Sequence, residues 1–161
     1  MRESISESWT IQIVAAFILL FVAFLALMIS YSKCFKTKNE VLSIVEKYQG
    51  FTDTSIGIIN DFITATNYRG TGSCDTSGTT IYGMPIGGNE LVRVSSGDNT
   101  RYRYCVRPQL VSDDTLVNYE IIMFYSFNIP AFGNIATFEV KGTTIDLNKK
   151  NCEITFSRCT L

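Results

Sequence analysis

One apolar run near the N-terminus constrains what this chain can fold into more than any other feature. It extends from Ile11 to Ile29, and Gln12 is its only polar side chain. As a helix with about 1.5 Å rise per residue, the run measures roughly 28 Å, close to the thickness of the hydrocarbon layer of a bilayer. No comparable run follows. We therefore expect a short segment at 1–10, a transmembrane helix at 11–30, and a polar part of about 130 residues, the size of one domain.

Two other interpretations of the run fit its pattern less well. A buried core helix would carry a polar stripe, and the run has none after Gln12. A signal peptide has a shorter apolar region of about 7 to 15 residues, although Ser30-Tyr31-Ser32 leaves cleavage after Ser32 open as the alternative. We interpret the run as a retained anchor, bracketed by aromatic rings that suit the membrane interface. The anchor residues are Trp9, Ile11, Phe17, Phe21, Leu25, Ile29 and Tyr31.

Charge and cysteine content give opposite answers on orientation. Lys33, Lys36 and Lys38 follow the run, whereas Arg2 is the only basic residue before it, so the positive-inside rule places the large domain in the cytoplasm. An even set of cysteines in one small domain instead indicates disulfides and an oxidising compartment. That set consists of Cys74, Cys105, Cys152 and Cys159. We favour disulfides and an extracytoplasmic domain.

The spacing of these cysteines argues against a zinc site. Zinc sites usually contain two close Cys pairs, whereas the chain has wide intervals and no His. Four cysteines allow three pairings, and we favour Cys74–Cys105 because it would tie a Gly-rich loop to the sheet. Cys152–Cys159 follows by elimination, but a straight strand would hold these two about 23 Å apart, so the tail would have to double back. Cys34 could be free, could pair with Cys34 of a second subunit, or, as we favour, could be a small apolar residue in a packed helix.

Two helices are expected at the start of the domain. The segment from Phe35 to Gln49 has an apolar face at helical spacing and continues the anchor without Pro or Gly, which predicts one long helix from about Ile5 to Gln49, ended by Gly50. Its second half, the stem at 31–50, should pack on the domain. A shorter helix follows, capped by Thr52 or Asp53. The two apolar faces contain Val41, Leu42, Ile44, Val45 and Tyr48, and then Ile58, Ile59, Phe62 and Ile63.

The pattern changes to period two from about Leu91, which is typical of strands. Val117 to Ile129 should form a long central strand, half covered on its second face and ended by Pro130. Further strands are expected at Arg101–Arg107, Ala136–Val140, Thr143–Leu147 and Glu153–Ser157, with turns at Lys141-Gly142 and Asn148–Asn151 and a long loop from Gly70 to Gly88. The expected fold is α+β: an antiparallel sheet in an extracytoplasmic domain at 51–161, packed on the stem.

The sequence contains no recognisable catalytic, cofactor or metal site. Without His, a Ser-His-Asp or Cys-His site is impossible. Asp113 and Asp114 are best interpreted as solvated acids in a turn, and Arg101, Arg103 and Arg107 as the exposed side of a strand. A net charge of -1 with no basic run gives no support to nucleic-acid binding. We expect a non-enzymatic protein.

Three segments resemble one known family. They are the anchor and stem through Lys36-Thr37-Lys38-Asn39-Glu40 and Tyr48-Gln49-Gly50, then Tyr68 to Cys74, then Ile129 to Thr143. Together with the plan of an apolar helix, an amphipathic stem and a small sheet domain, they resemble the TadE-type pseudopilins of tight-adherence pilus systems. Family members usually have a Gly or another small residue before the prepilin cleavage site and a Glu inside the start of the apolar run. Here no Gly precedes the run and Glu7 lies outside it.

The resemblance implies a structural component of a pilus or secretion apparatus, held by helix packing with other pilin-like subunits in the bilayer. Candidate assembly contacts are Glu7, which could neutralise a neighbouring N-terminal amine, together with Gln12, Val41 and Val45. Small residues at Ala15, Ala16, Ala23 and Ala26 would allow close helix approach. The alternative is an anchored extracellular binding or sensing domain that uses the loops between Gly70 and Thr100.

Overall fold

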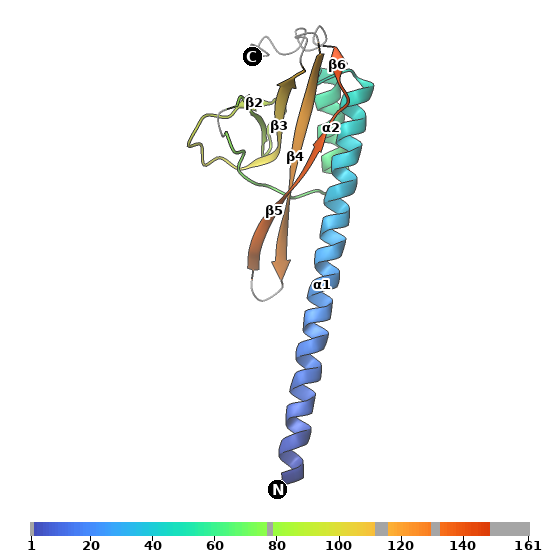
Figure 1. Cartoon of the computed structure of the whole chain (residues 1–161), viewed down its shortest axis with the longest axis vertical. Helices are drawn as coiled ribbons and strands as arrows, with labels where there is room; N and C mark the ends of the chain where they lie inside the picture. The colour runs from blue at the N-terminus through green and yellow to red at the C-terminus, as the bar shows by residue number, and fades with distance from the viewer. Residues whose placement is uncertain (1, 77–78, 112–115, 130–132, 149–161) are drawn as a thin grey trace.

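A rod-like helix carries a small α+β domain at one end in the computed structural model, which describes residues 2–76, 79–111, 116–129 and 133–148 (Figure 1). The predicted class is confirmed: a long N-terminal helix, a short second helix and an antiparallel sheet. The elements are α1 (Arg2–Lys47), α2 (Asp53–Ala65), β1 (Tyr82–Pro85), β2 (Val92–Arg93), β3 (Tyr102–Leu110), β4 (Leu116–Ile129), β5 (Gly133–Thr143) and β6 (Leu147–Asn148).

α1 is a single uninterrupted helix of 46 residues, which corresponds to about 69 Å at 1.5 Å per residue. It begins and ends within a few residues of the predicted bounds. At its end the chain turns through Gln49 (φ 58°) and Gly50 (φ 135°), and the Gly50 N–H donates to the Val45 carbonyl at 2.9 Å. A positive φ is tolerated best by Gly, so Gly50 allows the chain to leave α1 and enter α2 directly.

α2 starts at a reciprocal cap formed by Thr52 and Ser55. The Ser55 N–H donates to Thr52 Oγ1 at 3.1 Å, and the Thr52 N–H donates to Ser55 Oγ at 2.8 Å. This confirms Thr52 as the capping residue, an interaction typically worth about 0.5–2 kcal/mol. Ile59 and Ile63 are buried as expected, whereas Ile58 is only half-buried.

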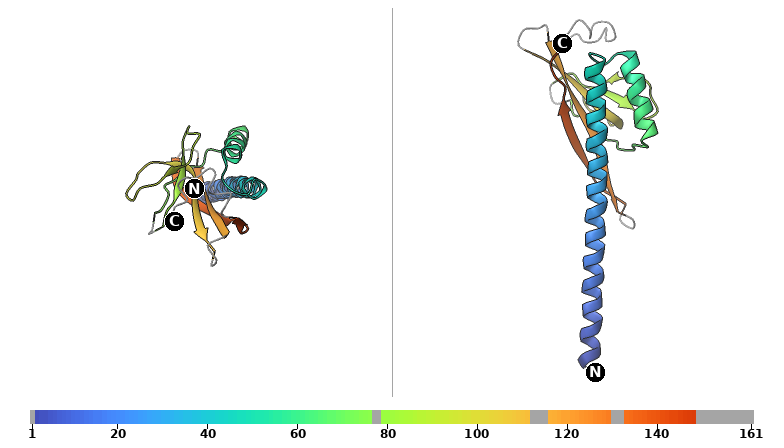
Figure 2. Two further views of the ribbon diagram at one scale, coloured as in Figure 1. Left: turned by 90° about the horizontal axis from the view of Figure 1, so that it is seen from above. Right: turned by 90° about the vertical axis from the view of Figure 1, so that its right-hand side faces the viewer.

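The sheet is antiparallel throughout, in the order β2-β1-β3-β4-β5, and β6 pairs with the first residues of β4. β4 is its longest strand, and both α1 and α2 lie on one face of the sheet (Figure 2). Tyr119, Ile121 and Met123 of β4 bury against that helical face, while Ile122 and Phe124 join a second apolar cluster on the opposite face. The predicted half-covered second face of β4 is therefore present.

Two predictions about the end of the sheet are wrong. Lys141-Gly142 is no turn, because β5 runs through both residues in register with Ile122 and Ile121 of β4. β4 is long enough to pair with the whole of β5, and Gly142 lets α1 approach: a Cβ there would lie 2.8 Å from Leu42 Cδ1. The strand expected at Thr143–Leu147 is also wrong, since the strand found there is Leu147–Asn148.

The remaining expectations fall on other parts of the chain. Asn148 belongs to β6 instead of the predicted turn, and the rest of that turn, Pro130 and Glu153–Ser157 lie outside the described residues. The segment predicted as one long loop before Leu91 contains β1. Gly83 and Pro85 have low strand propensity, so the sequence shows no strand pattern there. β1 pairs with β3 from Tyr82 to Pro85.

Gly83 gives a test of how tightly β1 packs. A Cβ at this position would lie 2.3 Å from Cδ1 of Tyr102, whose side chain is buried and cannot move aside. We predict that Gly83→Ala lowers the free energy of unfolding by about 1–3 kcal/mol, the usual range for overpacking. Urea unfolding of the full chain in detergent, followed by circular dichroism, measures this change.

The matched control is Gly57→Ala in α2. Gly57 is exposed, and a Cβ there would meet nothing within 4 Å. Alanine should therefore raise the free energy of unfolding by about 0.5–1 kcal/mol through helix propensity. Equal effects of the two substitutions would contradict the packing of β1 on Tyr102.

Candidate functional site

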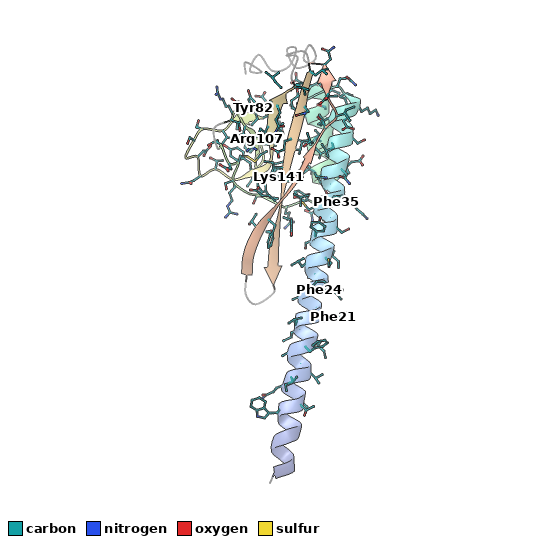
Figure 3. The ribbon with its side chains drawn as sticks, in the orientation of Figure 1. Phe21, Phe24, Phe35, Tyr82, Arg107 and Lys141 are labelled. Atoms are coloured by element: carbon teal, nitrogen blue, oxygen red, sulfur yellow. A yellow bond between two sulfur atoms is a disulfide. The ribbon has the colours of Figure 1, made fainter. Side chains whose placement is uncertain are left out.

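The candidate functional site is the apolar half of α1 together with its junction with the domain. α1 is long and apolar enough to cross a membrane, and within the described residues it is the one such helix. All seven predicted anchor side chains are exposed, with values from 44% for Tyr31 to 70% for Ile11. A water-soluble surface rarely exposes so much contiguous apolar area, whereas lipid accommodates it. Figure 3 shows apolar side chains, among them Phe21 of this set and the neighbouring Phe24, on the part of the helix that no other element covers.

The stem half of α1 differs from the apolar half, because one of its faces is buried against the sheet. Cys34, Val41 and Val45 are each 0% exposed and belong to the same apolar cluster as β4. The exposed face is polar and carries Lys36, Glu40 and Ser43. The stem thus joins the domain to the apolar half of α1 through one continuous helix.

This burial corrects one prediction about assembly. Val41 and Val45 cannot contact a second subunit, because their side chains are already covered by this chain's own sheet. Gln12 is exposed, so it remains available. The side chain of Glu7 lies outside the described residues.

Cys34 is a buried thiol in the contact between helix and sheet. Its Sγ lies 3.3 Å from the Tyr68 hydroxyl, which itself donates to the carbonyl oxygen of Phe124, so the thiol is the donor to Tyr68. Burial raises the pKa of the Cys34 thiol above its ordinary value. The favoured interpretation, a small residue in a packed helix, is therefore confirmed, and an intersubunit disulfide through Cys34 would require this contact to open.

The predicted Cys74–Cys105 disulfide is present, with a Cα–Cα distance of 5.8 Å. It fixes the segment before β1 to the middle of β3, within the cluster on the face away from the helices. Cys152 and Cys159 lie outside the described residues. The disulfide helps to cover the second face of β4, including Phe124.

Two of the arginine candidates, Arg107 and Arg101, have different surroundings in the structure. Arg107 donates to Glu120 at 2.9 Å and to the Asp75 carbonyl at 3.1 Å, which crosslinks β3 and β4 to the loop after Cys74. Arg101 lies at the rim of a shallow polar hollow of about 360 Å³, shared with Ser73 and Glu139. Within the described residues, no three His, Cys, Asp or Glu side chains gather as metal ligands. Asp113 and Asp114 lie outside that part of the chain.

Sequence reasoning missed an aromatic group where α1 meets the lower part of the sheet. The Tyr31 ring lies 5.8 Å from that of Tyr125 and 6.3 Å from that of Phe35, and Tyr125 stacks on Phe138 at 5.1 Å. We call Tyr31, Phe35, Tyr125 and Phe138 the junction cluster. The available signal was the length of the strand pattern at 117–129, because a strand this long extends beyond its neighbours.

Comparison with protein families, curated proteins and solved structures found no match for this chain. Function therefore has to be argued from the anchor, the stem and the domain themselves.

The disulfide yields a quantitative prediction. Cys74 and Cys105 are 31 residues apart, so closing this loop should stabilise the domain by about 3–4 kcal/mol in the chain-entropy estimate. The double variant Cys74→Ala/Cys105→Ala should lose that amount in urea unfolding under oxidising conditions. A reductant should shift the wild-type protein toward the double variant. If the wild-type protein unfolds at the same urea concentration with and without reductant, that result would contradict a stabilising Cys74–Cys105 bond.

Proposed function

We propose that this chain is a membrane-anchored, non-enzymatic structural subunit of a pilus or secretion apparatus, comparable to the TadE-type pseudopilins. The observation that carries the proposal is the division of α1 into a bare apolar half and a half buried in its own domain. A tether needs only a flexible linker between membrane and domain. An uninterrupted helix instead transmits the position of its lipid half to the domain, as an assembly subunit requires.

The anchor offers one face suited to close helix contact. At 3.6 residues per turn, Gln12 and Ala16 fall within an arc of about 40°, and both side chains are exposed. Val41, which faces the sheet, lies at the same angular position farther along the helix. A Gln side chain in hydrocarbon is stabilised by a hydrogen-bonding partner on another helix, and small residues let the backbones approach. This face, and not the stem, is the proposed contact with other subunits.

Two observations support an extracytoplasmic domain. A disulfide such as Cys74–Cys105 is typical of proteins in an oxidising compartment. Two of the three lysines that argue for the cytoplasm have partners in the protein: Lys38 is 8% exposed with its Nζ 4.6 Å from the Phe35 ring centroid, and Lys33 donates to the Asn67 carbonyl at 3.5 Å, whereas Lys36 is exposed. Their presence is explained by packing, so they weigh less in a positive-inside count.

A binding or sensing domain is the second candidate function. The hollow beside Ser73, Arg101 and Glu139 lies in the loop region that such a domain would use. Replacing the anchor by an unrelated transmembrane helix separates the two candidates, because a binding domain keeps its function and an assembly subunit loses it.

Cysteine crosslinking tests the proposed assembly face. In a background with Cys34, Cys152 and Cys159 replaced by alanine, Ala16→Cys should form a disulfide-linked product with a neighbouring subunit that carries the same substitution in native membranes. Val14→Cys is the matched control, since Val14 is also exposed but lies on the other side of the helix. Equal crosslinking at both positions, or none at Ala16→Cys, would count against assembly through this face.

Labelling of a cysteine introduced in the same background determines the orientation of the domain. Ser43 is exposed on the polar face of the stem, so Ser43→Cys should react with a membrane-impermeant maleimide added to intact cells. Reaction only after the cells are broken would place the domain in the cytoplasm.

A further inference from the structure

The polar hollow beside Arg101 lies on the face of the sheet opposite α1 and α2. Phe124 belongs to the apolar cluster of that face, and Glu139 of β5 stands opposite it in register. The volume of about 360 Å³ falls within the range of small-ligand pockets, and the hollow is open to solvent. Polar side chains from two loops and from β5 line it: Ser73, Asn99, Arg101, Thr137 and Glu139.

The floor of the hollow is held by backbone pairing. Gly72 forms an antiparallel bridge with Tyr102, with N···O distances of 3.0 and 2.8 Å. A Cβ on Gly72 would lie 2.3 Å from Cδ1 of Phe124, so glycine lets the backbone rest directly on this ring. Two residues farther along, the disulfide of Cys74 ties the same segment to β3. Ser73 therefore stands between two fixed points.

The wall that carries Asn99 and Arg101 is held by Asp98. Its Oδ1 accepts from the N–H and the hydroxyl of Thr100 at 2.8 and 2.5 Å, and its Oδ2 accepts from the Tyr102 hydroxyl at 2.6 Å. The hydrogen bonds from Thr100 and Tyr102 lower the pKa of Asp98 below its ordinary value. A loop held in this way needs little further ordering when a ligand binds, which favours affinity.

The polar groups that face the hollow are not paired with one another. Among the described residues, no hydrogen bond or ion pair is found for the side chains of Ser73, Asn99 and Arg101. Glu139, in contrast, has Lys141 as its partner, with 3.5 Å between Oε2 and Nζ. Of the charged groups in the described lining, Arg101 is therefore the one without a counter-charge.

This set of groups favours an acidic sugar over other small ligands. A guanidinium binds a carboxylate through two parallel hydrogen bonds, and hydroxyl and amide side chains pair with sugar hydroxyls. The Phe124 ring is 1% exposed, so it offers little surface to an apolar ligand. An amino acid suits the site less well, because its ammonium group would compete with Lys141 for Glu139.

We propose that this hollow binds a carboxylate-bearing sugar. The carboxylate lies on Arg101, and the ring hydroxyls pair with Ser73, Asn99 and Thr137. The site adds ligand recognition to the membrane-anchored subunit. It does not rest on assembly through α1, because none of its lining residues belongs to that helix.

Saturation-transfer NMR titration of the full chain in nanodiscs tests the proposal, with sodium galacturonate as the probe. Galactose has the same ring without the carboxylate, and sodium glutamate represents amino acids. We expect saturation transfer to galacturonate, roughly tenfold weaker binding of galactose because one charge-assisted pair is lost, and no transfer to glutamate.

Variants locate the binding. Arg101→Gln should weaken galacturonate binding roughly tenfold, to the level of galactose. Thr137→Tyr should block both sugars by filling the hollow, and it decides the location if Arg101→Gln fails to fold. Arg69→Gln is the matched control, since Arg69 is an exposed arginine outside the lining, and galacturonate binding should be unchanged.

Four results would overturn the site: no binding of galacturonate, equal binding of galactose, tighter binding of glutamate, or binding that both hollow variants leave unchanged. Each of these results leaves the crosslinking expected at Ala16→Cys untouched, so the sugar site and the assembly subunit fail separately.

Discussion

The packing of the stem face of α1 against β4 and β5 is the interaction on which the rest of the structure depends. Val41 and Val45 are completely buried there, and side chains of this kind each contribute about 1.5–3 kcal/mol when removed from water. Because the same helix continues into the apolar run, this contact fixes the domain relative to the anchor. Cys34 and Tyr68 add a polar link at its lower edge, where the Tyr68 hydroxyl reaches the backbone of β4.

The length of β4 has two consequences for the molecule. In its first half, β4 pairs with β3 and carries both apolar clusters, one under the helices and one under the Cys74–Cys105 region. In its second half, it pairs with β5 alone and brings Tyr125 to Tyr31 at the end of the anchor. One strand thus connects the core of the domain with the end of the apolar half of α1.

Much of the fold could be predicted from local patterns. Helical periodicity and the Thr52 cap gave α1 and α2, and strict alternation gave β3 and β4, because these signals lie within the elements themselves. The continuity of β5 through Lys141-Gly142 could not be predicted, since it depends on a partner strand long enough to pair with both residues. β1 was missed because Gly83 and Pro85 have low strand propensity, and pairing with β3 overrides it.

Part of the candidate site could likewise be predicted from the sequence, and part could not. The anchor residues from Trp9 to Tyr31 follow from composition and length. The burial of Val41 and Val45 against this chain's own sheet does not follow from the sequence. An apolar helical face has the same pattern whether it packs on its own sheet or on another subunit. The junction cluster joins residues nearly a hundred positions apart, so no sequence window contains it.

The central claim is that lipid anchor and stem are one rigid helix. Spin labels at Ala16→Cys and Glu40→Cys test it, in nanodiscs and with Cys34, Cys152 and Cys159 replaced by alanine; both label sites are exposed. Twenty-four residues of continuous helix separate their Cα atoms by about 36 Å, so the account predicts one narrow distance distribution near that value. Two glycines inserted after Ser32 provide the control for a hinged helix. A distribution in the unmodified helix as broad as in that control, extending to short distances, would contradict the account.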